Sequence, residues 1–338
     1  MQLVRVLFLG GLGRSGTTLL ERILGGLPGV CGLGEVIHLW ERDLRQGDRC
    51  GCGTPFADCD FWRCVGQEAF GGWHRVDVDR VLTLRRAVER LRHIPRLAAG
   101  SVNSNLVEYA TYYSRLYDAA AAVSGARVLV DSSKHPGLAF CLRQAAGVDL
   151  RVVHVVRDSR GVAHSWAAPT GGPQIDGTAT PEVGGTANPE VGGTATPEVG
   201  RTVVSPGRTP GRSALLWNAH NYAFELLGRC GVPVRRLRYE QLLADPRGCV
   251  RALAAYAGLE ADALDLSYLR REPDGTDHVD LRPGHSAAGS PMRFTAGTIA
   301  LRRDDAWRQA LRPRQRRLIG ALTAPLMGAY GYPLRSGA

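Results

Sequence analysis

Residues 4–24 read VRVLFLGGLGRSGTTLLERIL. Residues 4–9 form a short apolar run that is rich in branched and aromatic side chains, as buried strands are. A glycine-rich segment follows at once, and residues 19–24 then read as the start of a helix. This order predicts a strand, a loop and a helix. It is the opening unit of an α/β fold, and its loop is suited to holding an anion.

Further apolar runs along the chain also predict strands and helices. Strands are expected at 127–131, 150–156 and 234–238, and helices at 81–97, 106–123, 136–146 and 213–229, near Asp245 and in the arginine-rich C-terminus. Continuous apolar strands suit parallel pairing with both faces covered. We therefore expect an α/β fold with a P-loop-like, doubly wound, mainly parallel sheet flanked by helices, in a single domain over residues 1–338.

The composition supports a large folded chain with anionic partners. It has 338 residues, 44% hydrophobic and 22% charged, and a net charge of +10. All but one of its 42 basic side chains are arginines, and Lys134 is the exception. Phosphate-bearing small molecules and nucleic acid both fit this charge. A Walker-type nucleotidase is excluded, because no Lys-Ser or Lys-Thr follows the glycine-rich loop.

Two further features concern location and organisation. The sequence has no apolar stretch of about 18 residues and no cleavable leader, so we expect a soluble, cytoplasmic protein.

An eight-residue unit rich in Thr, Pro and Gly occurs three times over residues 178–201. It predicts a flexible loop over about 171–211, and an insertion by repeat slippage is favoured over a binding role.

The loop after the first strand carries several anion donors. Gly11 and Gly16 have the spacing of a phosphate loop, with Thr17 where the ATPase lysine would stand. Backbone N–H groups can still converge on an anion, and Arg14 and the hydroxyls of Ser15, Thr17 and Thr18 add donors. The alternative is a tight turn that binds nothing.

The chain here resembles the sulfotransferases that use 3′-phosphoadenosine 5′-phosphosulfate, in particular bacterial members and the carbohydrate and tyrosyl-protein branches. Their phosphosulfate loop matches the segment Arg14-Ser15-Gly16-Thr17-Thr18-Leu19. Their 3′-phosphate motif matches residues 155–165, in which Arg157 and Ser165 occupy the binding positions. Independently of the family, Arg157 ends a predicted strand, where ligands of open α/β sheets bind. An alternative is a structural Arg157–Asp158 pair.

Two later segments extend the resemblance to about residue 300. Tyr239 opens a segment whose tyrosine lies by the adenine in the family. Residues 285–294 are similar to a segment that closes over the 3′-phosphate, which implies that Gly289 and Arg293 bind the nucleotide. The cofactor-binding set implied is therefore Arg14, Ser15, Gly16, Thr17, Thr18, Leu19, Arg157, Ser165, Tyr239, Gly289 and Arg293.

Sulfonate transfer needs a base for the acceptor and a cation for the leaving phosphate. Lys134 stands two residues before a proline, where the resembled family carries a catalytic histidine or lysine. Glu35 stands where the family's Golgi-type members place a glutamate, and it is our candidate base. Arg14 would assist at the reacting phosphate. His38 and His135 are the alternative bases.

Four cysteines, Cys50, Cys52, Cys59 and Cys64, lie close together in the sequence. Their spacing lacks paired Cys-x-x-Cys units, so a local disulfide, a zinc site and free thiols stay open, and we expect no metal ligands and no required metal. Nearby Phe56, Phe61 and Trp62 suggest a flap beside the acceptor.

These observations predict an enzyme that moves sulfonate from 3′-phosphoadenosine 5′-phosphosulfate to a hydroxyl of a small molecule or glycan. The acceptor class, carbohydrate, glycolipid or natural product, stays open, as does the oligomeric state. The alternative is a nucleotide- or nucleic-acid-binding protein that uses the arginines of residues 302–317. A small-molecule kinase is disfavoured by the missing loop lysine.

Overall fold

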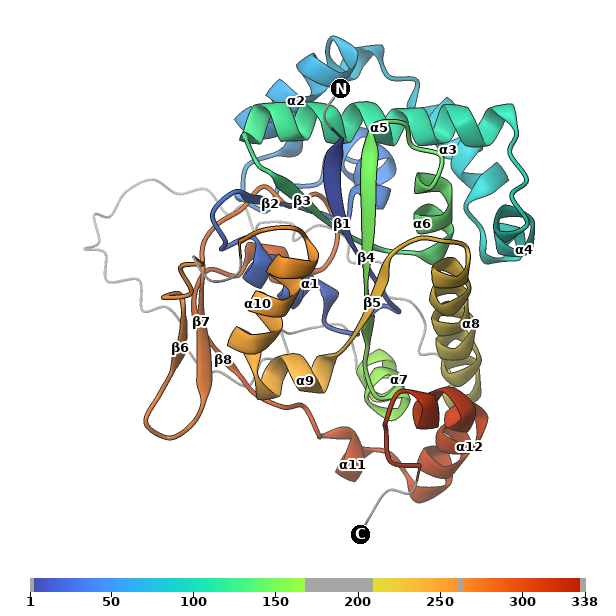
Figure 1. Cartoon of the computed structure of the whole chain (residues 1–338), viewed down its shortest axis with the longest axis vertical. Coiled ribbons are helices and arrows are strands. Elements are labelled where there is room, and N and C mark those ends of the chain that lie inside the picture. Colours follow the sequence, from blue (N-terminus) through green and yellow to red (C-terminus); the bar gives the residue numbers. More distant parts are fainter. Residues whose placement is uncertain (1–2, 168–208, 261–263, 335–338) are drawn as a thin grey trace, which may run out of the picture.

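The computed structural model describes residues 3–167, 209–260 and 264–334. Its centre is a five-stranded sheet in the order β2-β3-β1-β4-β5, in which all neighbours run parallel (Figure 1). The strands are β1 (Val4–Gly10), β2 (Val30–Gly34), β3 (Val128–Lys134), β4 (Val148–Val156) and β5 (Val234–Arg238). The predicted α/β fold with a mainly parallel, doubly wound sheet is confirmed.

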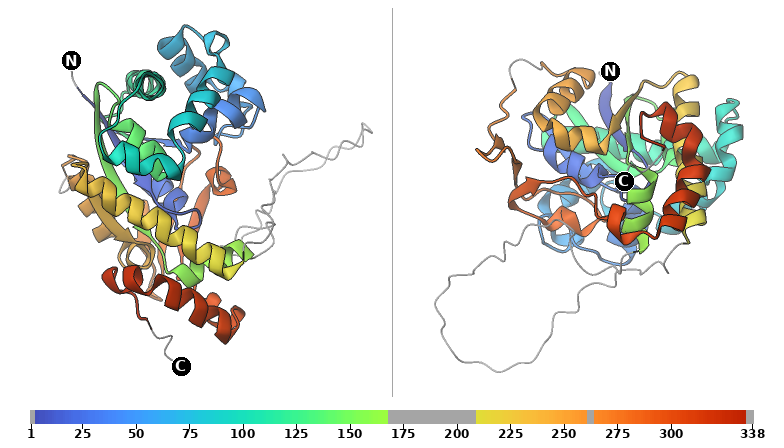
Figure 2. Two further views of the ribbon diagram at one scale, coloured as in Figure 1. Left: turned by 90° about the vertical axis from the view of Figure 1, so that its right-hand side faces the viewer. Right: turned by 90° about the horizontal axis from the view of Figure 1, so that it is seen from below.

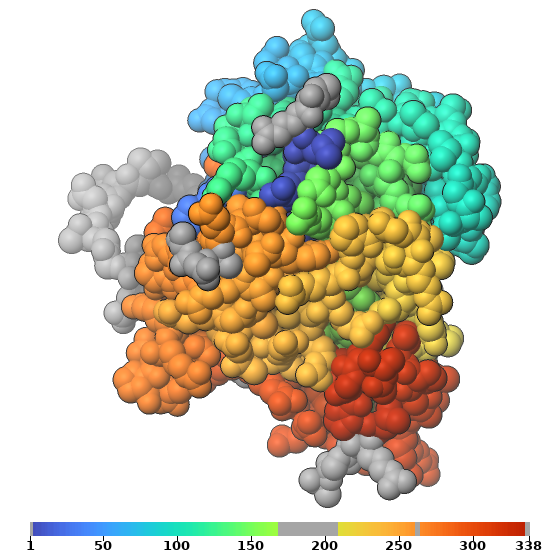
Figure 3. Space-filling model, viewed as in Figure 1, coloured from blue at the N-terminus to red at the C-terminus, as the bar shows by residue number. Residues whose placement is uncertain are grey.

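Helices cover both faces of this sheet because successive side chains of each buried strand point to opposite faces. Leu7 and Leu9 pack with α1 (Thr17–Leu24), α9 (Tyr239–Ala244) and α10 (Pro246–Tyr256). Figure 3 shows that α9 and α10 form much of the outer surface on this side. Val6 and Phe8 face the other core. Its helices are α2 (Asp60–Phe70), α3 (Val78–Val88), α4 (Ile94–Ala98), α5 (Ser104–Ser124), α6 (Pro136–Leu142) and α8 (Pro210–Arg229).

The C-terminal region adds two smaller parts. Strands β6 (Leu269–Arg271), β7 (Asp277–Leu281) and β8 (Gly297–Leu301) form an antiparallel sheet beside α1 and α10. Helix α12 (Pro313–Ala329) lies beside α8 and α7 (Ser159–Ala167), and α11 (Trp307–Ala310) packs on α7, as the two further views in Figure 2 show. Single helical turns occupy residues 36–38, 56–58, 73–75, 91–93 and 291–294, and residues 39–45 form a wider turn.

Several predicted elements differ in their bounds. The helix expected over 81–97 is two helices, because Arg90 is extended and Pro95 begins the second one. The C-terminal arginine-rich helix also divides, at Pro313. The helix expected from Ser213 begins at Pro210, and the strand expected over 127–131 continues to Lys134. The repeat of residues 178–201 lies outside the described residues.

The sheet order brings four sequence segments to one edge. Gly10, at the end of β1, pairs with Lys134 of β3 on one side and with His154 of β4 on the other. The segments after β1, β2, β3 and β4 therefore leave the sheet at neighbouring places. This carboxyl edge is where open α/β sheets bind ligands. In the part of the chain that the structure describes, no helix is long and apolar enough to cross a membrane.

Candidate active site

The loop from Gly11 to Gly16 requires its glycines. Both have positive φ, 154° at Gly11 and 90° at Gly16. A Cβ on Gly11 would lie 2.5 Å from the carbonyl oxygen of Val155, and one on Gly16 would lie 2.3 Å from the ring of Tyr239. The loop thus lies directly against the end of β4 and the start of α9.

The donors that the sequence predicted are gathered at the start of α1. Gly16 is the N-cap, and no side chain of the described residues caps the helix, so its first N–H groups face the loop. Ser15 and Thr17 are buried, and Thr17 Oγ1 has no hydrogen-bond partner in the described part of the chain. Arg14 is exposed at the tip of the loop. A buried hydroxyl beside an uncapped helix start fits a bound anion.

Arg157 connects this loop to the next one. Its guanidinium donates to the carbonyl oxygen of Arg14 at 3.0 Å and forms an ion pair with Asp304 at 2.6 Å. The same group lies 4.9 Å above the centre of the Tyr239 ring. Arg157 is buried, so its charge is held where solvent screens it little.

The alternative pairing of Arg157 with Asp158 is not formed. The Asp158 carboxylate instead accepts two hydrogen bonds from the guanidinium of Arg160, at 2.9 and 2.6 Å. This pair is buried under Trp307, whose ring lies 4.5 Å from the Arg160 guanidinium. Asp158 is therefore a structural anchor of α7, and Arg157 instead contacts Arg14 and Asp304 at the carboxyl edge.

Ser165 and Tyr239 lie on elements that start at this edge. Ser165 is half-buried in the last turn of α7, which follows β4. Tyr239 is the first residue of α9, which follows β5, and burial raises the pKa of its hydroxyl. Its ring packs between Arg157 and Gly16. The tyrosine therefore joins the two predicted phosphate loops.

Lys134 forms an ion pair with Glu35, at the ends of the neighbouring strands β3 and β2. Both side chains are largely buried. Lys134 has a φ of 69°, and Arg14 has a φ of 74°. Within the described ranges these are the two non-glycine residues with left-handed φ. Such strained residues gather at functional sites, because surrounding structure must hold them.

Glu35 is held on several sides. The backbone N–H of Ser290 donates to its Oε1 at 3.1 Å, and His38 Nε2 lies 3.7 Å from its Oε2. Burial raises the pKa of Glu35, but the electrostatic effects of Lys134 and His38 and the hydrogen bonds from Lys134 and Ser290 together outweigh it, so the pKa lies below its usual value. Burial lowers the pKa of His38 to about 3. At neutral pH the site thus holds an ionised carboxylate beside a neutral imidazole.

His135 has a carboxylate partner of its own. Its Nδ1 lies 3.4 Å from Oε1 of Glu89, a buried residue that also accepts a hydrogen bond from Tyr109 at 2.6 Å. The His135 and His38 rings are 6.1 Å apart. The imidazole is partly exposed and oriented by an acid, which is the arrangement of a general base.

The segment around Gly289 and Arg293 contacts Glu35 and the cysteine segment. A Cβ on Gly289 would lie 2.4 Å from Glu35 Oε1, so only glycine allows this approach. The Arg293 guanidinium donates to the carbonyl oxygens of Gly289 and Arg49, at 2.9 and 3.4 Å. Arg293 is thus buried in contacts that fasten this segment over Glu35.

The cysteine segment is folded into the core. Phe56 and Trp62 are buried and stacked at 5.2 Å, so these rings support the fold and do not form a free flap. All eight cysteines are free, which leaves no disulfide among the described residues. Cys50, Cys52 and Cys59 come together with His285, whereas Cys64 is exposed and lies outside this group.

Sequence reasoning missed three partners in the site. Asp304 is an acid within an arginine-rich run, a local contrast that could have marked it. Ser290 contributes only a backbone N–H, which leaves no signal in the sequence. Glu89 lies far from His135 in the chain, so only the packing of the end of α3 against the start of α6 reveals the contact.

Comparison with known proteins gives a structural similarity but no sequence match. No family model and no curated protein matches the sequence. The chain is similar to the sulfotransferase domain of the olefin synthase of Synechococcus PCC 7002, at 17% sequence identity and a TM-score of 0.49. The match covers 99% of this chain and 97% of that domain.

Proposed function

We propose that this protein transfers sulfonate from 3′-phosphoadenosine 5′-phosphosulfate to an acceptor hydroxyl. The observation that carries the proposal is the convergence at one sheet edge of two anion-suited loops and the Lys134–Glu35 pair. The two sequence motifs that resemble those of sulfotransferases occupy these same loops.

The 5′-phosphosulfate fits the loop that precedes α1. The backbone N–H groups of residues 14–19 and the buried hydroxyls of Ser15, Thr17 and Thr18 would donate to its oxygens. Thr17 Oγ1 lacks a hydrogen-bond partner in the described chain, so a phosphate oxygen would satisfy it. Arg14 adds an exposed guanidinium at the loop's tip.

The 3′-phosphate fits the next loop. Arg157 would exchange the carboxylate of Asp304 for the phosphate, and Ser165 would add a hydroxyl. Tyr239, which packs between the two loops, would face the nucleoside. Gly289 and Arg293 would act indirectly, because their contacts fasten the segment that covers Glu35.

Transfer needs one proton acceptor and one cation. The donor supplies the sulfonate, and its phosphate end leaves as adenosine 3′,5′-bisphosphate. Glu35, ionised at neutral pH, accepts the proton of the acceptor hydroxyl as that oxygen bonds to sulfur. Lys134 then neutralises the charge that grows on the phosphate oxygen whose bond to sulfur breaks. Arg14 assists it from the loop.

The acceptor would approach from the side of Glu35 that carries His38 and His135. These rings leave polar and aromatic surface beside the carboxylate, which suits a carbohydrate, glycolipid or natural-product hydroxyl. His135, oriented by Glu89, is the second candidate base.

The rival function is nucleotide or nucleic-acid binding through residues 302–317. Several of these arginines are already engaged: Arg303 and Arg308 pair with Asp305, at 3.2 and 3.4 Å. Arg316 donates to the carbonyl oxygen of Arg308 at 2.6 Å. Their charge is therefore partly neutralised within the fold, which weakens the rival.

Calorimetry with adenosine 3′,5′-bisphosphate separates the two functions. The proposal expects saturable binding that is weakened at least about tenfold in Arg157→Ala, because a buried charged contact is lost. Arg303→Ala is the matched control and should bind normally. Absence of nucleotide binding together with salt-sensitive DNA binding would support the rival. A radiolabelled sulfonate donor, incubated with candidate acceptors, then tests transfer itself.

A further inference from the structure

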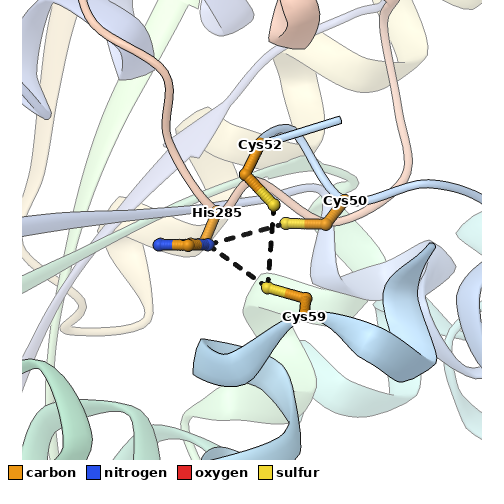
Figure 4. A group of neighbouring side chains, drawn as sticks. All are labelled: Cys50, Cys52, Cys59 and His285. Carbon is orange, nitrogen blue, oxygen red and sulfur yellow. Dashed lines mark hydrogen bonds between the residues drawn. The ribbon is translucent and has the colours of Figure 1, made fainter. Parts of the chain in front are cut away.

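Three cysteines and one histidine converge beside the proposed active site (Figure 4). Cys50, Cys52 and Cys59 come from one short segment, and His285 comes from the segment that covers Glu35. Nδ1 of His285 lies 3.2 Å from Cys59 Sγ and 3.8 Å from Cys50 Sγ. The sulfurs of Cys52 and Cys59 are 3.8 Å apart. All four potential ligand atoms lie within 4.8 Å of one another.

These separations are those of a metal site rather than of a disulfide. A disulfide would bring two sulfurs to about 2.0 Å. A tetrahedral zinc ion with bonds of about 2.3 Å to sulfur and 2.0 Å to nitrogen has sulfur–sulfur edges of about 3.8 Å and sulfur–nitrogen edges of about 3.5 Å. Three thiolates and one imidazole are also a common donor set of structural zinc. We propose that Cys50, Cys52, Cys59 and His285 bind one structural zinc ion.

The backbone already holds the cysteine segment in a tight loop. The N–H of Cys50 donates to the carbonyl of Thr54 at 2.9 Å, and the N–H of Gly53 donates to that of Cys50 at 2.8 Å. Gly51 lies so near the other segment that a Cβ would be 2.8 Å from the carbonyl oxygen of Gly284. The ligands therefore sit on a scaffold that brings both segments together.

The fourth ligand is also fixed. The ring of Phe61 stacks on that of His285 at 5.1 Å, with 19° between their planes. The indole N–H of Trp62 donates to the His285 carbonyl at 2.7 Å. These contacts set the direction in which Nδ1 points, toward the sulfurs of Cys50 and Cys59. Such supporting contacts are typical of metal-binding histidines.

The role of the zinc ion follows from the segment that comes directly after His285, because this segment contacts β2 and Glu35. Ala287 donates to the carbonyl of Leu33 at 2.8 Å, and Ser290 donates to Glu35. A metal at His285 would tie this covering segment to residues 50–59. Four protein ligands leave no open position for substrate, so the ion is structural and takes no part in transfer.

Metal analysis of the purified full chain tests the proposal. We expect about one zinc per chain, and less than about one tenth of that in Cys59→Ser and in His285→Ala, since each removes a ligand. Cys64→Ser is the matched control, because Cys64 lies in the same segment but outside the cluster. This control should keep its zinc.

Two further measurements use only the wild-type protein, so they test the proposal even if the variants fail to fold. X-ray absorption at the zinc edge of the wild-type protein should show three sulfurs at about 2.3 Å and one nitrogen at about 2.0 Å. A strong chelator should lower the melting temperature of the wild type, and added zinc should restore it. The proposal would be overturned by wild-type protein that lacks stoichiometric zinc or that holds an iron–sulfur cluster. It would also be overturned if Cys64→Ser lost its zinc as fully as Cys59→Ser and His285→Ala do. None of these results depends on sulfonate transfer.

Discussion

Lys134 and Glu35 form an ion pair at the ends of two neighbouring strands, β3 and β2. The pair is buried, and Lys134 reaches it from a left-handed backbone conformation. Surrounding contacts thus hold the lone lysine of the chain against the candidate base. The Lys134 charge lowers the pKa of Glu35 and so favours the ionised carboxylate that a base needs.

Replacing Lys134 tests its role toward the leaving group. We expect Lys134→Met to lower kcat about 100-fold or more, because a buried cation no longer meets the growing negative charge. Binding of adenosine 3′,5′-bisphosphate, measured by calorimetry, should change only a few fold. An unchanged kcat would remove Lys134 from the mechanism.

The pH profile tests the coupling of the pair. Burial raises the pKa of Glu35, but the electrostatic effects of Lys134 and His38 and the hydrogen bonds from Lys134 and Ser290 together bring it below its usual 4.5. The acidic limb of kcat/KM should therefore lie below that pH in the wild type and move to higher pH in Lys134→Met, where the largest lowering contribution is lost and burial weighs more. Lys134→Arg keeps the charge and should keep the limb low. A limb that stays in place in Lys134→Met would contradict the coupling.

Two matched variants identify the base. In Glu35→Gln the limb should disappear and kcat should fall about 100-fold or more, because the amide cannot accept the proton. His135→Asn should retain the limb with a smaller loss of rate. The opposite outcome, a preserved limb in Glu35→Gln and a lost one in His135→Asn, would assign the base to the His135–Glu89 pair.

The Asp304 carboxylate forms an ion pair with the Arg157 guanidinium, which the 3′-phosphate would need. We expect Asp304→Asn to tighten the binding of adenosine 3′,5′-bisphosphate about 3- to 10-fold, because the phosphate no longer displaces a carboxylate. Adenosine 5′-phosphate, which lacks the 3′-phosphate, should show a smaller gain. Asp305→Asn, next in sequence and paired with Arg303 and Arg308, is the control. Equal or weaker binding in Asp304→Asn would place the 3′-phosphate elsewhere.

Gly16 tests the contact between the first loop and Tyr239. Gly16→Ala adds a methyl group into the Tyr239 ring at a φ of 90°, so we expect a loss of about 1 to 3 kcal/mol in the free energy of unfolding. Gly13→Ala meets nothing nearer than Trp166 at 3.9 Å and should keep its melting temperature. Similar melting temperatures for both variants would mean that the loop accommodates a methyl group at Gly16 without loss of stability.

Asp43 should make stability depend on pH. It accepts a hydrogen bond from the N–H of Ala288 at 2.9 Å, and burial raises its pKa from 3.8 to about 7. The folded protein therefore holds this proton more tightly than the unfolded chain, and stability falls as pH rises between these values. Asp43→Asn removes the titration, so its urea midpoint relative to wild type should be higher at pH 8 than at pH 4.5. A constant difference would contradict the raised pKa.

The sequence allowed most of the central strands and the positions of the two candidate phosphate loops to be predicted, because their signals are local. A continuous apolar run marks β1 and β4, and fixed glycine and arginine spacing marks the loops. Strand β2 was missed because two glycines interrupt its short apolar pattern. Strands β6 to β8 were missed because they are short and partly polar.

The site was predictable as separate residues but not as an arrangement. Lys134 and Glu35 were each chosen from the sequence, yet their contact depends on β2 pairing with β3, and this strand order leaves no local signal. The three cysteines of the cluster are likewise close together in the sequence, where a disulfide, a zinc site and free thiols all stayed open, whereas His285 comes from a distant segment. Long-range pairing of this kind follows from the packing of the whole core.

The position of β1 has a consequence for synthesis of the chain. Strand β1 is translated before the other strands of the sheet, yet its neighbours, β3 and β4, follow more than a hundred residues later. Until then β1 and β2 expose unpaired edges, which attract other strands. Ser290, the donor to Glu35, is translated later still. The nascent chain therefore passes through a long aggregation-prone interval, and chaperone supply should govern the yield of active protein.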